Sequence, residues 1–132
     1  MNKIKYFCIF LIMGMSLVGC ANRAMSGWKN VNNKPDFLYF GATWCGPCKK
    51  MKTLFKDDDV KKELDKYNFV MYDVDMDKSE ARKHRVEYVP TMIFLKSEVG
   101  SIINLGRYVG GKNKQELLAI LRKHLKKHQA NH

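Results

Sequence analysis

The sequence has no internal repeat, no low-complexity segment and no apolar stretch long enough to cross a bilayer. Its most apolar stretch, 6–18, has thirteen residues, whereas a membrane-spanning helix needs about 20. Cysteine is scarce, with four in 132 residues. With 45% apolar and 28% charged residues, the composition excludes a disordered or fibrous chain and predicts one small globular domain.

The first nineteen residues have the pattern of an export signal. Lys3 and Lys5 precede the uncharged stretch, which ends in Leu17-Val18-Gly19-Cys20. This ending resembles the lipobox of bacterial lipoproteins, in which cleavage precedes the cysteine and the cysteine thiol is acylated. We therefore expect an exported protein that is anchored to a membrane through lipid on Cys20 and faces the periplasm or the cell exterior. An uncleaved hydrophobic anchor and an N-terminal helix packed in the core are the alternatives.

Residues 21–35 are polar, rich in asparagine and without sustained periodicity, so they are expected to form a tether. Trp28 within it is expected either to cover part of the domain or to lie in a membrane interface. The predicted organisation is a lipoprotein signal peptide at 1–19, a lipidated N-terminus and tether at 20–35, a folded domain at 36–128 and a tail at 129–132.

Acidic residues are few, 13 against 24 basic ones, so the formal net charge is +11. The basic residues are spread over several predicted helices and no nucleic-acid motif is present, so we expect no nucleic-acid partner. Solvated helix faces account for the charge, with attraction to anionic lipid headgroups or envelope polymers near the tether as a further contribution.

Short apolar runs alternate with amphipathic segments in the folded domain, which predicts an α/β architecture. The expected strands are 37–40, 69–74, 92–95 and 102–109, and the expected helices are 48–56, 60–67, a short one that ends at His84 and a last one that opens at Asn113.

Three of these helices are preceded by residues that predict N-terminal caps. The caps are the acidic turn 57–59, Asp77 with Glu80, and Asn113 with Glu116. Core positions are expected for four methionines, and a frayed, solvated tail is expected for the C-terminal histidines. These residues are Met51, Met71, Met76 and Met92, and His124, His128 and His132.

Two cysteines remain in the folded domain if Cys8 leaves with the signal and Cys20 carries lipid, namely Cys45 and Cys48. Their spacing at a strand-to-helix junction suits disulfide exchange, because the first thiol can attack a substrate disulfide and the second can release the product. The free N–H groups and positive dipole end of a helix favour a thiolate on the first cysteine and lower its pKa below about 8.5. We therefore predict Cys45 as the nucleophile and Cys48 as the resolving thiol, with Pro47 in the first helical turn.

A zinc site and a purely structural disulfide are the alternatives for this pair. Zinc normally has four protein ligands in a structural site, whereas Cys45 and Cys48 supply two and no second pair exists. A disulfide that closes a two-residue loop constrains little chain and adds little stability. Both alternatives are therefore less favoured than a redox site.

The segment 37–127 resembles the thioredoxin family. Trp44-Cys45-Gly46-Pro47-Cys48-Lys49 is similar to the family's active-site motif without substitution, and Val89-Pro90-Thr91 is similar to its cis-proline loop. The resemblance implies a thioredoxin fold, with a central mixed β-sheet of about four to five strands flanked by helices. It also implies a redox-active disulfide between Cys45 and Cys48, supported by Trp44, Gly46 and Pro47.

The same resemblance implies a substrate-binding surface formed by Val89, Pro90, Thr91 and Gly110. A cis peptide at Val89-Pro90 would turn the backbone of Val89 outward to pair with an extended substrate. An ordinary trans proline at the start of an edge strand and a plain turn at Gly110 are the simpler interpretations of these two positions.

Two positions depart from the family pattern. Thioredoxin proper has a buried aspartate where this sequence has Tyr39, and the lysine usually near that aspartate aligns with Met71. The Tyr39 hydroxyl could hydrogen-bond to a buried thiol or hold a water, but with a free pKa near 10 it is a poor base at neutral pH. This departure argues against fast thioredoxin-like turnover and favours a specialised exported relative.

These observations predict a protein-disulfide oxidoreductase of the cell envelope that acts as a reductant, needs no organic cofactor or metal and is a monomer. Its expected partners are protein thiols and disulfides, with a membrane-embedded thiol relay as electron donor. A disulfide oxidase or isomerase with the same cysteine pair, and a redox-inert thioredoxin-like binding module, remain open.

Overall fold

A computed structural model of the chain describes residues 33–98 and 100–130. The predicted signal peptide, Cys20 and Trp28 lie outside these residues. Four strands form one sheet in the order β2-β1-β3-β4, with β1 parallel to β2 and antiparallel to β3, and β3 antiparallel to β4. The elements are β1 Asp36–Gly41, α1 Gly46–Leu54, α2 Asp58–Leu64, β2 Asn68–Asp73, α3 Lys78–Lys83, β3 Thr91–Glu98, β4 Ser101–Val109 and α4 Lys114–Ala130. The predicted thioredoxin fold is confirmed.

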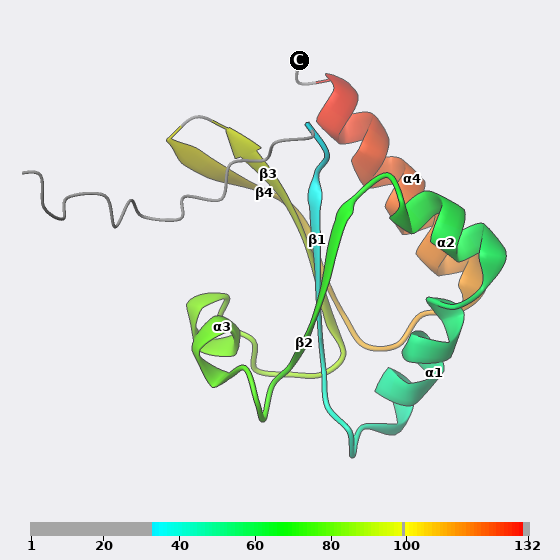
Figure 1. Cartoon of the computed structure of the whole chain (residues 1–132), viewed down its shortest axis with the longest axis vertical. Helices are drawn as coiled ribbons and strands as arrows, with labels where there is room; N and C mark the ends of the chain where they lie inside the picture. Colours follow the sequence, from blue (N-terminus) through cyan, green and yellow to red (C-terminus); the bar gives the residue numbers. More distant parts are fainter. Residues whose placement is uncertain (1–32, 99, 131–132) are drawn as a thin grey trace, which may run out of the picture.

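Helices cover both faces of the sheet, with α1, α2 and α4 on one face and α3 on the other (Figure 1). Because side chains of a strand alternate between faces, Phe37 and Tyr39 of β1 enter the core beneath α1, α2 and α4, while Leu38 and Phe40 enter the core beneath α3. Burial on both faces explains why 37–40 is an unbroken apolar run. The ring of Phe37 stacks on that of Phe94 in β3, with centroids 4.5 Å apart.

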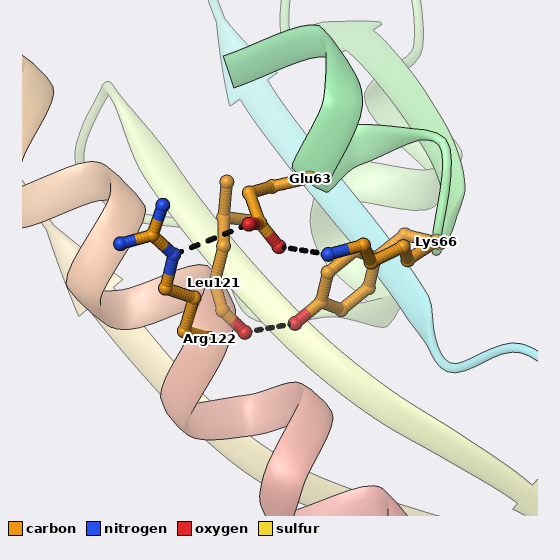
Figure 2. Close-up of polar contacts among 5 residues, drawn as sticks. Glu63, Lys66, Leu121 and Arg122 are labelled. Carbon is orange, nitrogen blue, oxygen red and sulfur yellow. Dashed lines mark hydrogen bonds and ion pairs between the residues drawn. The ribbon is translucent and has the colours of Figure 1, made fainter. Parts of the chain in front are cut away.

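Polar contacts join α2 to α4 at the surface of the larger core (Figure 2). Glu63 of α2 accepts hydrogen bonds from Arg122 of α4 at 3.1 Å and from Lys66 at 2.8 Å. The bond from Lys66, aided by Arg122, holds the pKa of Glu63 below its usual value despite burial. Tyr67, whose hydroxyl donates to the Leu121 carbonyl, adds a buried link to the same helix. These contacts hold α4 against α2 and the turn that follows α2.

Two of the three predicted caps are confirmed. The Asp57 carboxylate accepts the Asp59 N–H at 3.0 Å at the start of α2. At the start of α4, the Asn113 side chain accepts the Glu116 N–H at 2.9 Å, and Glu116 accepts the Asn113 N–H at 3.0 Å. This reciprocal pair is the predicted capping box.

The predicted cap at Asp77 is wrong, because no side chain caps the start of α3. The Asp77 carboxylate instead accepts the Asp73 N–H at 2.9 Å, which closes the turn between β2 and α3. The rule of a carboxylate three residues before a glutamate fails here because the end of the preceding strand offers a competing donor.

The predicted solvated tail is also wrong for two histidines of α4. His124 is 2% exposed, stacks on Phe94 with centroids 4.4 Å apart and places Nε2 2.9 Å from the Tyr108 hydroxyl. A Cβ at Gly106 would lie 2.5 Å from the His124 ring, so the missing side chain of Gly106 makes room for that ring. The helix continues to Ala130, into the segment predicted as a tail, and His132 lies outside the described residues.

His128 is 3% exposed, and its Nε2 lies 3.0 Å from the Asn33 carbonyl. The segment next to Asn33 is tied down as well, because the Asn68 N–H donates to the Pro35 carbonyl at 3.0 Å and Lys34 Nζ donates to the Asp65 carbonyl at 2.7 Å. The last three residues of the predicted tether therefore contact the domain.

Two of the four methionines predicted in the core are on the surface. Met51 and Met92 are buried, but Met71 is 53% exposed and Met76 is 84% exposed. Met71 belongs to β2, which is an edge strand of the described sheet, and Met76 lies in the turn between β2 and α3. The apolar pattern of β2 did not distinguish an edge strand from a central one.

Candidate active site

Cys45 and Cys48 lie where β1 passes into α1, and they form a disulfide with their Cα atoms 5.2 Å apart. Cys45 is 5% exposed and Cys48 is fully buried. This order of exposure agrees with the expected roles, an attacking thiol on the first cysteine and a resolving thiol on the second.

Cys45 is the N-cap of α1, which begins at Gly46, two residues earlier than predicted. Its Sγ accepts the N–H of Cys48 at 3.2 Å, and its carbonyl accepts the N–H of Lys49. Pro47 stands in the first turn, where a missing N–H costs no helical hydrogen bond. The positive end of α1 and a donated N–H thus point at Cys45 Sγ, an arrangement that stabilises a thiolate there after reduction.

The loops before β3 and after β4 meet beside the cysteine pair. The Val89–Pro90 peptide bond is cis, as the resemblance implied, and Val89 packs against the buried cluster of Ala42, Cys45 and Cys48. Gly110 has φ +87° and donates its N–H to the Pro90 carbonyl at 2.8 Å. Thr91 bonds to the same loop through Oγ1, which donates to the Tyr88 carbonyl at 2.6 Å. The structure therefore brings the four predicted substrate-binding positions to one side of the disulfide.

Gly111, which follows Gly110, completes this side of the site. A Cβ at Gly111 would lie 3.3 Å from Cβ of Pro47, so a larger residue would press on the first turn of α1. The N–H of Lys112 donates to Sδ of Met51 in α1 at 3.3 Å. The loop after β4 is thereby fitted closely against the helix that carries Cys48.

Trp44 is 68% exposed at the mouth of the site, and its indole Nε1 donates to the Asp75 carboxylate at 2.9 Å. Asp75 is held in turn, because its N–H donates to Asp73. Sequence reasoning missed Asp75, which lies 31 residues from Trp44. No local pattern connects the two positions, so only the parallel pairing of β1 with β2 reveals the contact.

Tyr39 lies behind the cysteines and is fully buried, with its hydroxyl donating to the Cys48 carbonyl at 3.4 Å. The Tyr39 hydroxyl thus hydrogen-bonds to the backbone of Cys48, and burial raises the pKa of Tyr39 to about 12. A Cβ at Gly41 would lie 2.9 Å from the Tyr39 ring, so the absent side chain of Gly41 leaves room for this ring. The strand register places Met71 opposite Tyr39.

Exposed large side chains flank several of the predicted site residues in the chain. Tyr88 is 67% exposed and Val109 is 48% exposed. Each is one residue from a predicted substrate-binding position, Val89 and Gly110 respectively. With Trp44, they are exposed large side chains next to site residues in the chain.

Within residues 33–98 and 100–130, no group of three or more histidine, cysteine or acidic side chains is placed to hold a metal ion. The same described residues contain no helix that is both long and apolar enough to cross a membrane.

Comparisons with known proteins agree on one family. The thioredoxin family model matches residues 26–123. Thioredoxin H-type 2 of Nicotiana tabacum is 38% identical over 115 residues, which are 86% of this chain and 90% of that protein. The thioredoxin of Echinococcus granulosus is 44% identical over 66 residues, 48% of this chain and 60% of that protein.

Solved structures give the same result. A thioredoxin from Thermus thermophilus superposes with a TM-score of 0.61 at 29% identity, covering 68% of this chain and 72% of that one. A thioredoxin from Trichomonas vaginalis superposes with a TM-score of 0.59 at 27% identity, covering 67% of this chain and 78% of that one. The likeness therefore extends from sequence to the arrangement of strands and helices.

Proposed function

The chain belongs to the thioredoxin family, and on that basis we propose that it reduces disulfides of protein substrates in the cell envelope while a lipid on Cys20 holds it to a membrane. One observation carries the chemical part of this proposal. The sulfur of Cys45 caps a helix start and lies in a disulfide with the fully buried Cys48, beside the loop of Val89.

The first step of the proposed reaction is attack by the Cys45 thiolate on one sulfur of a substrate disulfide. A bond forms between Cys45 Sγ and that sulfur, the substrate S–S bond breaks, and the second substrate sulfur leaves as a thiolate that takes up a proton from water. The backbone of Val89 pairs with the extended substrate segment and holds its disulfide against Cys45.

In the second step the Cys48 thiol loses its proton and attacks Cys45 Sγ. The mixed disulfide breaks, the Cys45–Cys48 disulfide forms and the second substrate thiol is released. Two electrons have then passed from the cysteine pair to the substrate. A dithiol of a membrane-embedded relay returns the pair to the reduced form by the same exchange in reverse.

Proton transfer in the second step is where this chain departs from the family pattern. With a pKa of about 12, the Tyr39 hydroxyl does not accept a proton at neutral pH. Its hydrogen bond goes to the Cys48 carbonyl in the first turn of α1 and not to the Cys48 thiol. We therefore expect release of the mixed disulfide to be slower than in a thioredoxin with a buried acid.

The Gly-Pro pair between the cysteines favours the reducing direction. Thioredoxin has a reduction potential near −270 mV, whereas the strong oxidant of the bacterial periplasm lies near −120 mV. Export through the segment 1–19 and acylation of Cys20 would place a reductant in an oxidising compartment. Such a reductant needs a continuous supply of electrons, which is why the proposal includes a membrane-embedded donor.

Substrate trapping tests the exchange chemistry. Cys48→Ser removes the thiol that resolves the mixed disulfide, so the variant expressed in its native host is expected to accumulate disulfide-linked adducts with substrates. Cys45→Ser is the matched control and is expected to form none. If Cys48→Ser traps nothing while Cys45 remains open to alkylation, disulfide exchange is not the function and a binding module is favoured.

Metabolic labelling with a fatty acid tests the anchor separately. The full chain is expected to incorporate label and the Cys20→Ser variant is expected to lose it. Absence of label from the wild-type chain would remove the lipoprotein assignment and leave the exchange chemistry standing.

A further inference from the structure

Helix α4 connects the active site with the point where the chain enters the domain. Just before its first turn, the N–H of Lys112 bonds to Met51 of the cysteine-bearing helix. Near its end, His128 lies 3.0 Å from the carbonyl of Asn33. The helix has 17 residues, and at 1.5 Å per residue it is about 25 Å long. The entry point and the cysteines therefore lie at opposite ends of the sheet (Figure 1).

The second half of α4 carries a basic surface, which we define as Lys123, Lys126 and Lys127. All three are exposed. Lys123 and Lys126 form no ion pair with any residue in the described part of the chain. Lys127 donates to the carbonyl of Leu105, an uncharged partner that leaves its charge unneutralised. The only acidic residue of α4 is Glu116, which lies in its first turn at the far end.

Stabilisation of the helix by its own dipole does not account for this surface. Cations near the C-terminus of a helix are favourable, but the effect falls off within the last turn. Lys123 lies seven residues before Ala130, about two turns from the helix end. A cluster that extends this far without acidic partners has the composition of a surface for an anionic partner.

We propose that the basic surface of α4 docks on the anionic lipid headgroups of the membrane that carries the Cys20 anchor, with the active site turned away from the bilayer. This inference rests on the lipid-anchored part of the proposed function. Cys20 precedes Asn33 by thirteen residues, a chain that spans at most about 45 Å when extended. The tether enters the domain at the end that bears the lysines, so the docked domain leaves Cys45 facing soluble substrates. A tether of this length also lets the undocked domain turn its cysteine pair toward the membrane-embedded donor.

Tryptophan quenching tests this orientation on the lipidated full chain in vesicles that carry a spin-label quencher on the headgroups. The chain has two tryptophans, Trp28 and Trp44, so changing both to Phe gives a background for single reporters. A reporter made by Gln129→Trp marks the end of α4, and the Trp28→Phe variant alone keeps Trp44 as a reporter of the active site. In anionic vesicles we expect strong quenching of the α4 reporter and weak quenching of Trp44.

Charge reversal provides the matched comparison. Each basic side chain near an anionic surface strengthens binding roughly fivefold, so Lys123→Glu with Lys126→Glu is expected to lower the ratio of docked to undocked domain by about 25-fold or more. Zwitterionic vesicles or 0.5 M salt are expected to act in the same direction. Lys50→Glu with Lys56→Glu changes the net charge equally, on α1 and in the turn that follows it, and is expected to leave the quenching unchanged.

Equal quenching of the two reporters in anionic vesicles, or equal effects of the two charge reversals, would overturn the docking proposal. Disulfide reduction by the wild-type chain in the same vesicles separates this failure from failure of the function, because the exchange chemistry does not depend on docking. Absence of fatty acid on Cys20 would remove the anchor and the docking together and leave the exchange chemistry in place.

Discussion

The cysteine pair and the buried histidines of α4 have different surroundings. At the cysteine pair, the sulfur of Cys45 lies at a helix start and follows Trp44, whose side chain is 68% exposed. On the buried face of α4, His124 and His128 are 2% and 3% exposed, and His124 stacks on Phe94. The comparison indicates that the reactive groups lie at the start of α1, whereas the histidines of α4 contribute to packing of the core. Changes in one region should therefore leave the property of the other intact.

The largest expected effect is on the rate of disulfide reduction, with little effect on stability. Cys45→Ser removes the attacking thiolate and should lower the rate of disulfide reduction by about 10³-fold or more, since a serine hydroxyl is not ionised at neutral pH. The free energy of unfolding of the reduced protein should change by less than about 1 kcal/mol. Reduction of a model protein disulfide and urea unfolding measure the two quantities. Residual activity above a few per cent would mean that Cys48 can attack substrates directly.

Lowering the pH should destabilise the folded protein through the α4 region. Burial, with Lys123 and Lys127 nearby, lowers the pKa of His124 to about 4 from an ordinary value of 6.5. The unfolded chain thus binds a proton that the folded chain does not between these values, so stability falls as the pH drops from about 6.5 to 4, by about 3 kcal/mol in total. His124 Nδ1 is buried without a hydrogen-bond partner among the described residues, so an added N–H there would be unsatisfied.

Urea unfolding at pH 7, 5.5 and 4.5 measures this loss, with His124→Leu as the variant that lacks the titrating group. The difference in unfolding free energy between the wild type and His124→Leu should shift in favour of the variant as the pH falls. A difference that does not change with pH would show that His124 is protonated in the folded state or is more solvated than its position indicates.

Gly106→Ala should destabilise the same region by a smaller amount. The added Cβ would lie 2.5 Å from the His124 ring, and overpacking of this kind costs about 1–3 kcal/mol. In a His124→Ala background the same substitution meets no ring and should cost much less, so the two changes should be strongly non-additive. Thermal unfolding of the wild type, the two single variants and the double variant measures the coupling free energy between positions 106 and 124. Additive effects would show that the backbone moves to accept the methyl group.

The smallest expected effect belongs to Tyr39→Phe. The variant loses the hydrogen bond from the hydroxyl to the Cys48 carbonyl, which at 3.4 Å should contribute less than about 1 kcal/mol. The rate of disulfide reduction should stay within about twofold, because a hydroxyl with a pKa of about 12 transfers no proton at neutral pH. A tenfold loss of the single-turnover rate for release of the mixed disulfide would show that Tyr39 takes part in proton transfer.

Much of the site could be predicted because its signals are local. The apolar run 37–40 followed by Cys45 and Cys48 places both thiols at a strand-to-helix junction, and the capping box of Asn113 and Glu116 marks the start of α4. The cis bond at Val89–Pro90 followed from the family resemblance.

Contacts between distant segments could not be predicted in the same way. The bond from Trp44 to Asp75 depends on the pairing of β1 with β2, and the space for Tyr39 depends on the absent side chain of Gly41. His124 did carry a signal, since it lies seven and three residues after Leu117 and Leu121 on the buried face of α4. Its residue type suggested solvent, whereas the room left by Gly106 and the ring of Phe94 allow a neutral imidazole in the core.

The reduction potential of the Cys45–Cys48 pair tests the central claim most directly. The chain with Cys8→Ser and Cys20→Ser retains only this pair and can be equilibrated with dithiothreitol or glutathione buffers, with the thiol fraction read by alkylation. A reductant with a Gly-Pro pair between its cysteines is expected to have a potential near −270 mV and to reduce a model protein disulfide. A potential above about −180 mV would contradict the reducing role and assign the same cysteines to disulfide formation or isomerisation.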